Sequence, residues 1–109
     1  MTGARKALLA AVPAIATSLA PPGPARAETH IVSMAQVAFS PPTLTVRAGD
    51  TVEWNNRDIV AHTATSAEAV FDIDVAPSHK GSAVLNRAGT FNYICRYHPT
   101  MKGQITVKP

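Results

Sequence analysis

The stretch that decides the fold of this chain is Thr43-Leu44-Thr45-Val46-Arg47-Ala48-Gly49-Asp50-Thr51-Val52-Glu53-Trp54. Apolar and polar side chains alternate on both sides of a small Ala-Gly-Asp turn, with Leu44 and Val46 before it and Val52 and Trp54 after it. A two-residue period is the pattern of a β-strand with one buried face, and a short polar turn joins two such strands. This stretch therefore predicts β structure. The rest of the domain shows no convincing helical period either.

Working outward, the same alternation predicts an early strand pair in residues 31–39 and further strands at 62–65, 90–94 and 104–107. Residues 66–76 fit either one strand or a short helical turn. Strands at roughly 8–12-residue spacing, separated by polar turns, are typical of β-sandwiches. We expect an all-β fold, a Greek-key β-sandwich of about seven to eight strands.

Residues 1–27 have the organisation of a secretory signal peptide. Arg5 and Lys6 precede a small apolar stretch, and Ala25-Arg26-Ala27 places small residues where a signal peptidase reads. The apolar stretch is too short for a membrane span, which needs roughly 20 apolar residues. We expect cleavage after Ala27, export to the periplasm, and a single mature domain of residues 28–109.

The excess of positive charge belongs to the leader. The chain has ten Lys and Arg residues against seven Asp and Glu. Three of the basic residues, Arg5, Lys6 and Arg26, precede the predicted cleavage point, so the mature domain carries seven of each sign. A near-neutral domain without a basic patch gives no indication of nucleic-acid binding.

The chemistry-bearing motif is Cys95-x-x-His98-x-x-Met101, which contains the only cysteine of the chain. Disulfides form in exported proteins, so a single cysteine there indicates another use for the thiol. Thiolate, imidazole and thioether are ligands that suit copper. A further ligand must come from elsewhere, and His62, at the start of a predicted strand, is the best candidate. Two His, one Cys and a weak axial Met form the arrangement of blue-copper electron-transfer sites.

Other interpretations of these residues exist. The cysteine could be a small buried hydrophobe and Met101 could fill the core. Zinc is the main rival metal, although structural zinc sites favour more thiolates and catalytic ones favour His with carboxylate.

The chain resembles the cupredoxins, the type 1 blue copper proteins, and most closely the amicyanin, pseudoazurin and plastocyanin group. The matching segments are residues 39–46, 48–56 and 88–95, followed by His98-Pro99 and Met101-Lys102-Gly103. The resemblance implies one copper ion held by four ligands: His62, Cys95, His98 and Met101. It also implies that His98 is the electron port, within an apolar docking patch for which the candidates are Tyr97, Pro99, Val60 and Ala61, with Val37 a weaker one.

Three positions depart from the family pattern. Thr63 stands where Asn is common after the first histidine, and Arg96 stands where Thr or Ser is common after the cysteine. In relatives these two positions often share a hydrogen bond that braces the ligand loops, and a Thr63–Arg96 contact cannot be that same bond. Thr100 replaces a large apolar residue, which predicts a more polar docking patch.

His30 offers a second, separate metal hypothesis. Cleavage after Ala27 would leave Glu28-Thr29-His30 at the N-terminus. A free amine, two amide nitrogens and an imidazole in the third position can surround Cu(II) or Ni(II) in a square plane. His79, in a Pro- and Gly-containing turn, is expected to be an exposed residue without such a role.

These observations predict a soluble periplasmic electron carrier that cycles between Cu(I) and Cu(II), exchanges electrons with redox proteins such as a dehydrogenase, cytochrome or oxidase, and works as a monomer. The alternative is a periplasmic protein for copper sequestration or delivery. An enzyme is not expected, because copper enzymes need further His ligands for a second centre, commonly as His-x-His pairs, and the domain has no such pair.

Overall fold

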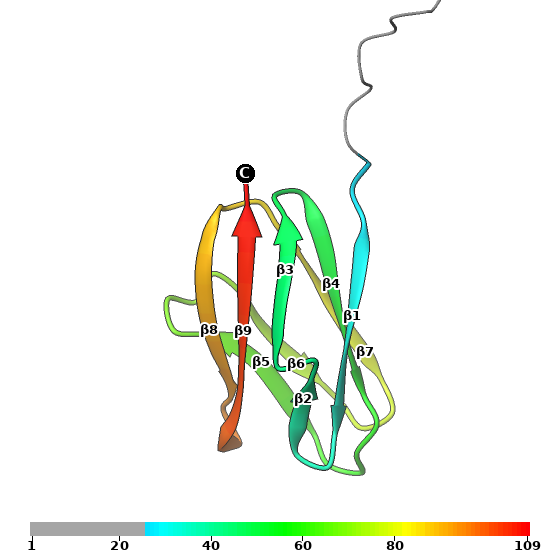
Figure 1. Cartoon of the computed structure of the whole chain (residues 1–109). Helices are drawn as coiled ribbons and strands as arrows, with labels where there is room; N and C mark the ends of the chain where they lie inside the picture. Colours follow the sequence, from blue (N-terminus) through cyan, green and yellow to red (C-terminus); the bar gives the residue numbers. More distant parts are fainter. Residues whose placement is uncertain (1–25) are drawn as a thin grey trace, which may run out of the picture.

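Alternating burial along the chain builds nine β-strands that pack as a two-layer sandwich (Figure 1). The structure is a computed structural model and describes residues 26–109. The strands are β1 (Thr29–Ala35), β2 (Ala38–Ser40), β3 (Thr43–Arg47), β4 (Asp50–Asn56), β5 (His62–Ser66), β6 (Asp72–Val75), β7 (Lys80–Leu85), β8 (Gly89–Cys95) and β9 (His98–Lys108). The predicted all-β sandwich is confirmed, with nine strands instead of seven to eight.

The structure completes or changes the predicted strands in three places. The strand that sequence reasoning missed is β7, in which only Leu85 is fully buried and Val84 points to solvent, so its apolar alternation is weak. The ambiguous stretch 66–76 contains the short strand β6, and no helical turn forms in it. β9 begins at His98, well before the predicted start at residue 104.

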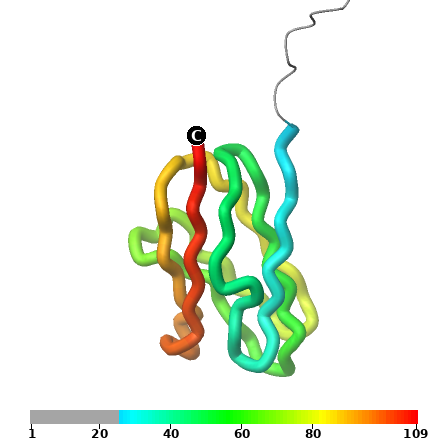
Figure 2. The backbone as a smooth tube through the Cα atoms, viewed as in Figure 1, coloured from blue at the N-terminus to red at the C-terminus, as the bar shows by residue number. Residues whose placement is uncertain are grey.

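The strands form two mixed sheets. One has the order β2-β1-β4-β7 and the other the order β3-β9-β8-β5-β6. Most neighbours are antiparallel, but β1 runs parallel to β4 and β3 runs parallel to β9. The tube in Figure 2 shows how the chain passes between the layers, from β2 into β3 and from β4 into β5. This crossing brings segments distant in sequence to the same end of the sandwich.

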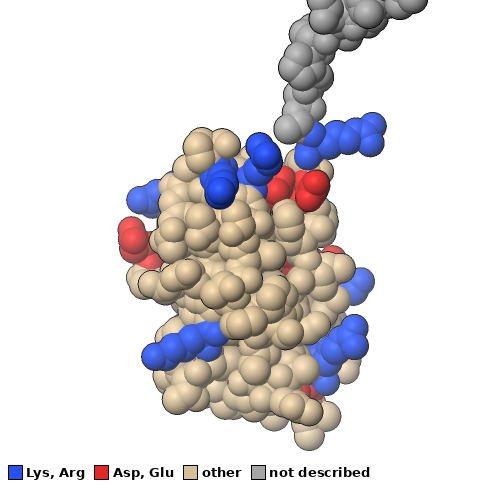
Figure 3. Space-filling model, viewed as in Figure 1, with Lys and Arg blue, Asp and Glu red and all other residues tan. Residues whose placement is uncertain are grey.

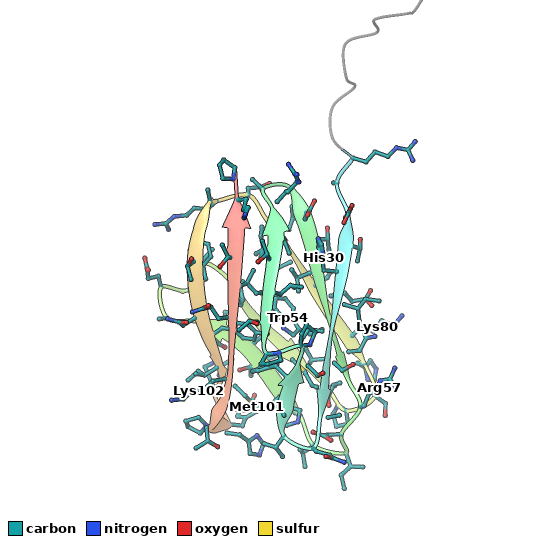
Figure 4. The ribbon with its side chains drawn as sticks, in the orientation of Figure 1. His30, Trp54, Arg57, Lys80, Met101 and Lys102 are labelled. Atoms are coloured by element: carbon teal, nitrogen blue, oxygen red, sulfur yellow. The ribbon has the colours of Figure 1, made fainter. Side chains whose placement is uncertain are left out.

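The core between the sheets is built around Trp54, which is fully buried on β4 and lies midway along the sandwich (Figure 4). Its ring packs against those of Phe71 and Tyr93, with ring centroids 5.3 and 5.7 Å apart. The Trp54 indole N–H donates a hydrogen bond of 3.3 Å to the Tyr93 hydroxyl. Burial raises the pKa of Tyr93 to about 12, so the phenol stays neutral inside the core. Each such large apolar side chain contributes roughly 1.5–3 kcal/mol by leaving water.

Tyr93 also covers a glycine on the neighbouring strand. Tyr93 and Gly103 are paired residues of β8 and β9. A Cβ atom placed on Gly103 would lie 2.4 Å from the Tyr93 Cζ, far inside van der Waals contact. The aromatic ring therefore occupies the space that a side chain at position 103 would need.

The predicted signal peptide falls outside the described residues, apart from Arg26 and Ala27. Within the described part of the chain, no helix is long and apolar enough to cross a membrane.

Candidate metal centre

Three neighbouring strands bring the predicted ligands together at one end of the sandwich. β8 ends at Cys95, and the two-residue turn Arg96–Tyr97 leads into β9, which begins at His98. β5 pairs with β8 in the antiparallel sense, so the start of β5, with His62, lies at the same end of the sandwich as the last residues of β8. Figure 4 shows Met101 at this lower end of the molecule and His30 toward the opposite one.

The thiol and two imidazole groups converge closely. The Cys95 Sγ lies 3.7 Å from the His62 Nδ1 and 3.7 Å from the His98 Nδ1. All three ligand atoms lie within 4.8 Å of one another, and the two rings meet edge to face with centroids 5.1 Å apart. Bonds from a metal to His or Cys are about 2.0–2.3 Å long, so ligand atoms at these separations can share one ion.

The centre is shielded on most sides. His62 and Cys95 are fully buried, and Met101 is 2 % exposed. His98 is only partly buried, so its ring reaches the protein surface. Met101, the predicted fourth ligand, is held at the start of β9 three residues after His98, and its role as a ligand remains a prediction.

Thr63 makes two hydrogen bonds to the end of β8, one to the Cys95 sulfur and one to the next residue. Its backbone N–H donates to the Cys95 Sγ at 3.3 Å, a bond that stabilises negative charge on the sulfur. Its hydroxyl accepts a hydrogen bond of 2.8 Å from the backbone N–H of Arg96. The departures at these two positions therefore still allow a brace between the β5 and β8 ends. It uses the Thr63 hydroxyl and a main-chain donor, because the Arg96 side chain turns outward.

The Arg96 side chain reaches the carboxylates of β6 instead. Its guanidinium lies 3.3 Å from Asp72 and 3.3 Å from Asp74. The neighbouring Tyr97 hydroxyl donates to Asp74 at 3.0 Å, and this bond raises the pKa of Tyr97. These exposed contacts make the rim of the centre polar on the β6 side.

Asp58, which follows β4, is a supporting residue that the sequence analysis did not include. Its carboxylate accepts a 2.7 Å hydrogen bond from the His62 Nε2, which must donate because a carboxylate can only accept. With the proton of the ring fixed on Nε2, the Nδ1 lone pair faces the cysteine sulfur and is free for a metal.

The same carboxylate holds the turn between β1 and β2. It accepts the backbone N–H groups of Gln36 at 2.8 Å and Val37 at 3.0 Å. Both turn residues have positive φ, of 54° and 56°, which is strained for a β-branched Val. The bonds from Val37, His62 and Gln36 lower the pKa of Asp58 and keep it ionised. One carboxylate thus ties a ligand ring to a strained surface turn.

The predicted docking residues lie at the same end of the sandwich. Val60 is 43 % exposed and Tyr97 53 % exposed, and Ala61 and Pro99 are also exposed. Ile59, which the sequence analysis did not include, is the most exposed large hydrophobic residue described, at 93 %. Val37, exposed on its turn, adds a further apolar side chain.

The other two histidines lie apart from this centre. His79 is exposed in a turn, as expected, and its Nδ1 lies 2.9 Å from the Pro77 carbonyl oxygen. His30 lies on β1, where its Nε2 is 2.9 Å from the Asp50 carboxylate. Glu28, His30 and Asp50 form a second group whose ligand atoms lie within 4.8 Å of one another. The square-planar site predicted for His30 remains a prediction.

Comparison with known proteins agrees with this geometry. A family model described as "Cupredoxin-like domain" matches residues 7–107. The chain is 31% identical over 84 residues to amicyanin of Paracoccus denitrificans, a match that covers 72% of this chain and 64% of that protein. It is 35% identical over 86 residues to plastocyanin of Scenedesmus fuscus, covering 66% of this chain and 88% of that protein. The matches span about two-thirds of the amicyanins' own length.

Solved structures give the same result. The reduced, Cu(I) form of an amicyanin mutant superposes with a TM-score of 0.67 at 28% identity, over 73% of this chain and 82% of that one. An oxidised amicyanin mutant gives a TM-score of 0.67 at 29% identity with the same coverage. His62, Cys95 and His98 are accordingly the ligand set of a type 1 copper centre that takes one copper ion. The chain belongs to the cupredoxin family.

Proposed function

We propose that this protein is a soluble periplasmic carrier that passes single electrons between redox proteins, with Met101 as the fourth copper ligand. Its amicyanin and plastocyanin relatives are electron carriers. The observation that carries the proposal is a largely buried group of one cysteine sulfur and two imidazoles, of which His98 is the member that reaches the surface.

When bound at this centre, copper supplies the one-electron Cu(I)/Cu(II) couple. The residues of the chain supply the rest. Asp58 holds the His62 ring in one orientation, and the Thr63 amide stabilises charge on the Cys95 sulfur. Because three hydrogen-bonded strands hold the ligands, they need little rearrangement when the charge of the site changes. Burial keeps water away from the centre, and the partly exposed His98 ring offers the shortest route for an electron.

The surface around His98 supports docking to another protein. The predicted patch of Val60, Ala61, Tyr97 and Pro99 gains Ile59, which stands almost fully exposed. Figure 3 shows few charged side chains at the lower tip of the viewed face, and most charge lies higher on the molecule. Apolar surface of this kind marks sites of protein contact. We propose that redox partners dock here while the protein itself works as a monomer.

The absorption spectrum of the copper-loaded mature protein tests the carrier function. We expect an intense visible thiolate-to-copper band that disappears on reduction and that Cys95→Ser abolishes, while the matched exposed-turn variant His79→Ala keeps it. A colourless protein that binds Cu(I) and readily gives it up would overturn the carrier function and favour copper sequestration or delivery.

Docking has its own test. Since the mature domain carries as many acidic as basic residues, the electron-transfer rate with a partner should fall only modestly between low and high salt. Ile59→Ser should slow the reaction at all salt concentrations without changing the visible band. A steep salt dependence together with an inert Ile59→Ser variant would contradict the apolar docking surface.

A further inference from the structure

The end of the sandwich opposite the copper centre contains a buried carboxylate with no strong cationic partner. Asp50 is 4 % exposed at the start of β4. Among the described residues, its ion-pair contacts within 4 Å involve His30 alone, which is charged only when protonated. A buried carboxylate normally needs a full positive charge or several hydrogen bonds nearby.

Three donors converge on this carboxylate. The backbone N–H of Arg47 donates to Oδ2 at 2.9 Å, and the His30 Nε2 lies 2.9 Å from the same oxygen. The backbone nitrogen of Glu28 donates to the other oxygen, Oδ1, at 2.9 Å. These bonds lower the pKa of Asp50 to about 2, with the bond from Glu28 as the largest cause. Asp50 is therefore ionised at neutral pH.

The nitrogen of Glu28 is also the atom that the predicted cleavage would release. Water hydrolyses the Ala27–Glu28 peptide bond in the active site of a signal peptidase. The carbonyl carbon of Ala27 takes the hydroxyl and the Glu28 nitrogen takes the proton. At neutral pH the new carboxyl group loses its proton and the amine gains one, so Glu28 begins with an ammonium group. That nitrogen already lies within hydrogen-bond distance of a buried anion. A neutral donor thereby becomes a charged one, and charge-assisted hydrogen bonds are about twice as strong as neutral ones.

We propose that Asp50 is the receptor for the mature N-terminus, so that removal of the leader creates a partly buried ion pair between the Glu28 α-ammonium and the Asp50 carboxylate that fixes β1 against β4. This inference rests on the predicted cleavage after Ala27 and is independent of the proposed electron-carrier function.

Charged side chains of both signs surround Asp50. A surface hollow of about 590 Å³ adjoins the carboxylate, and its charged and titratable lining residues are Arg26, Glu28, His30, Arg47, Asp50 and Lys108. Figure 3 shows charged side chains of both signs gathered at this upper end, where the described chain begins. Cleavage removes the Arg26 guanidinium from the hollow and places the new positive charge directly on Asp50.

The backbone connects this ion pair to the sheet. The Glu28 carbonyl accepts a hydrogen bond of 2.9 Å from the Thr51 amide, next to Asp50, and Thr29 is the first residue of β1 paired with β4. Glu28 thus bonds β4 through its carbonyl and Asp50 through its nitrogen. Fixing its position also fixes the start of the parallel β1–β4 pairing.

The test compares two copper-loaded chains, one that begins at Glu28 and one that begins at Ala27, so that a single residue moves the charge away from Asp50. We expect the Glu28 chain to melt higher at pH 7 by on the order of 5 °C. Acetylation of the Glu28 amine should remove the difference. So should Asp50→Asn in both chains, whereas Glu68→Gln, which removes an exposed carboxylate elsewhere, should preserve it. Equal melting temperatures of the two chains with Asp50 intact would overturn the proposal.

Three further measurements keep the proposal falsifiable if Asp50→Asn fails to fold. Pairing with an anion raises the pKa of an amine, so the difference in melting temperature should be full below the ordinary amine value of about 8 and should vanish above the raised value. A difference that persists unchanged at pH 11 would contradict an ion pair.

A second equivalent of Cu(II) bound through the amine and amides of residues 28–30 would also contradict the ion pair, since one amine cannot bind both Cu(II) and Asp50. An exported protein whose first residue is not Glu28, by intact mass, would overturn the processing step itself.

Discussion

The two ends of the sandwich contain nearly the same small structure, yet only one of them is a copper centre. At each end an aspartate accepts two backbone N–H groups and bonds the Nε2 of one histidine, Asp58 with His62 and Asp50 with His30. At both ends the bonds lower the pKa of the carboxyl. A braced histidine is therefore common to both ends and is not enough to make the type 1 centre.

The difference lies on the far side of the imidazole. The His62 Nδ1 faces the Cys95 sulfur, and the His98 ring completes the group. The His30 Nε2 instead faces two carboxylates, that of Asp50 at 2.9 Å and that of Glu28 at 3.9 Å. A thiolate with two imidazoles favours copper, whereas hard carboxylates beside one imidazole do not select it. The second and third ligands, supplied by the β8–β9 hairpin, turn the shared brace into a redox site.

The largest expected difference between the two ends concerns the histidines themselves. His62→Ala removes a copper ligand and should abolish the intense visible band, because a trigonal site cannot form. His30→Ala should keep the band at full strength. Absorption spectra of the two variants after loading with one equivalent of copper decide the point. A blue His62→Ala protein would mean that a different histidine ligates the metal.

The aspartates should differ next. Asp58→Asn can no longer hold the His62 ring as a charged acceptor, and loss of such outer partners typically costs 10–100-fold in metal affinity. We expect this weakening for Cu(I), measured by competition with a chelator, with the visible band retained. Asp50→Asn should leave the copper affinity unchanged. Equal copper affinities of the two variants would remove Asp58 from the support of the centre.

A smaller effect is expected where the two ligand strands are braced. Thr63→Val removes the buried hydroxyl that accepts the Arg96 backbone N–H and should lower the free energy of unfolding by about 0.5–1.5 kcal/mol, measured by urea denaturation. Thr90→Val is a matched control, because the Thr90 hydroxyl bonds only the exposed Thr106 hydroxyl. If Thr90→Val lowers the free energy of unfolding as much as Thr63→Val does, the Thr63–Arg96 hydrogen bond makes no specific contribution to stability.

The smallest expected effect is on the stability of the protein at low pH. The pKa of Asp50 lies at about 2 in the folded protein, below the ordinary value of about 3.9 for an aspartate side chain, so the folded state binds this proton less readily. The resulting stabilisation is fully present above pH 4 and is lost as the pH falls through 4 toward 2. The urea midpoint of the apoprotein should fall across this window, and Asp50→Asn should flatten the fall. An identical slope in both proteins would contradict this role of Asp50.

Much of the fold and of the ligand set could be predicted from the sequence, because alternating burial and the Cys-x-x-His-x-x-Met spacing are local signals. Trp54 and the strands around residue 49 fall into this class, as do Cys95 and His98. Sequence reasoning missed Asp58, Ile59 and the Asp50 cluster, which depend on contacts between residues about 20 apart or on which side of a loop faces solvent. No local pattern distinguishes an aspartate that braces a histidine from one that ends a strand.

The contact between Tyr93 and Gly103 limits how this sequence can vary. Because the tyrosine ring fills the space of a side chain at position 103, the two positions are expected to change together, with a larger residue at 103 accompanied by a smaller one at 93. A substitution at either position alone would overpack or hollow the sheet two residues from Met101. Packing in the core thus restricts sequence variation at Gly103, which lies on the strand that begins with a copper ligand.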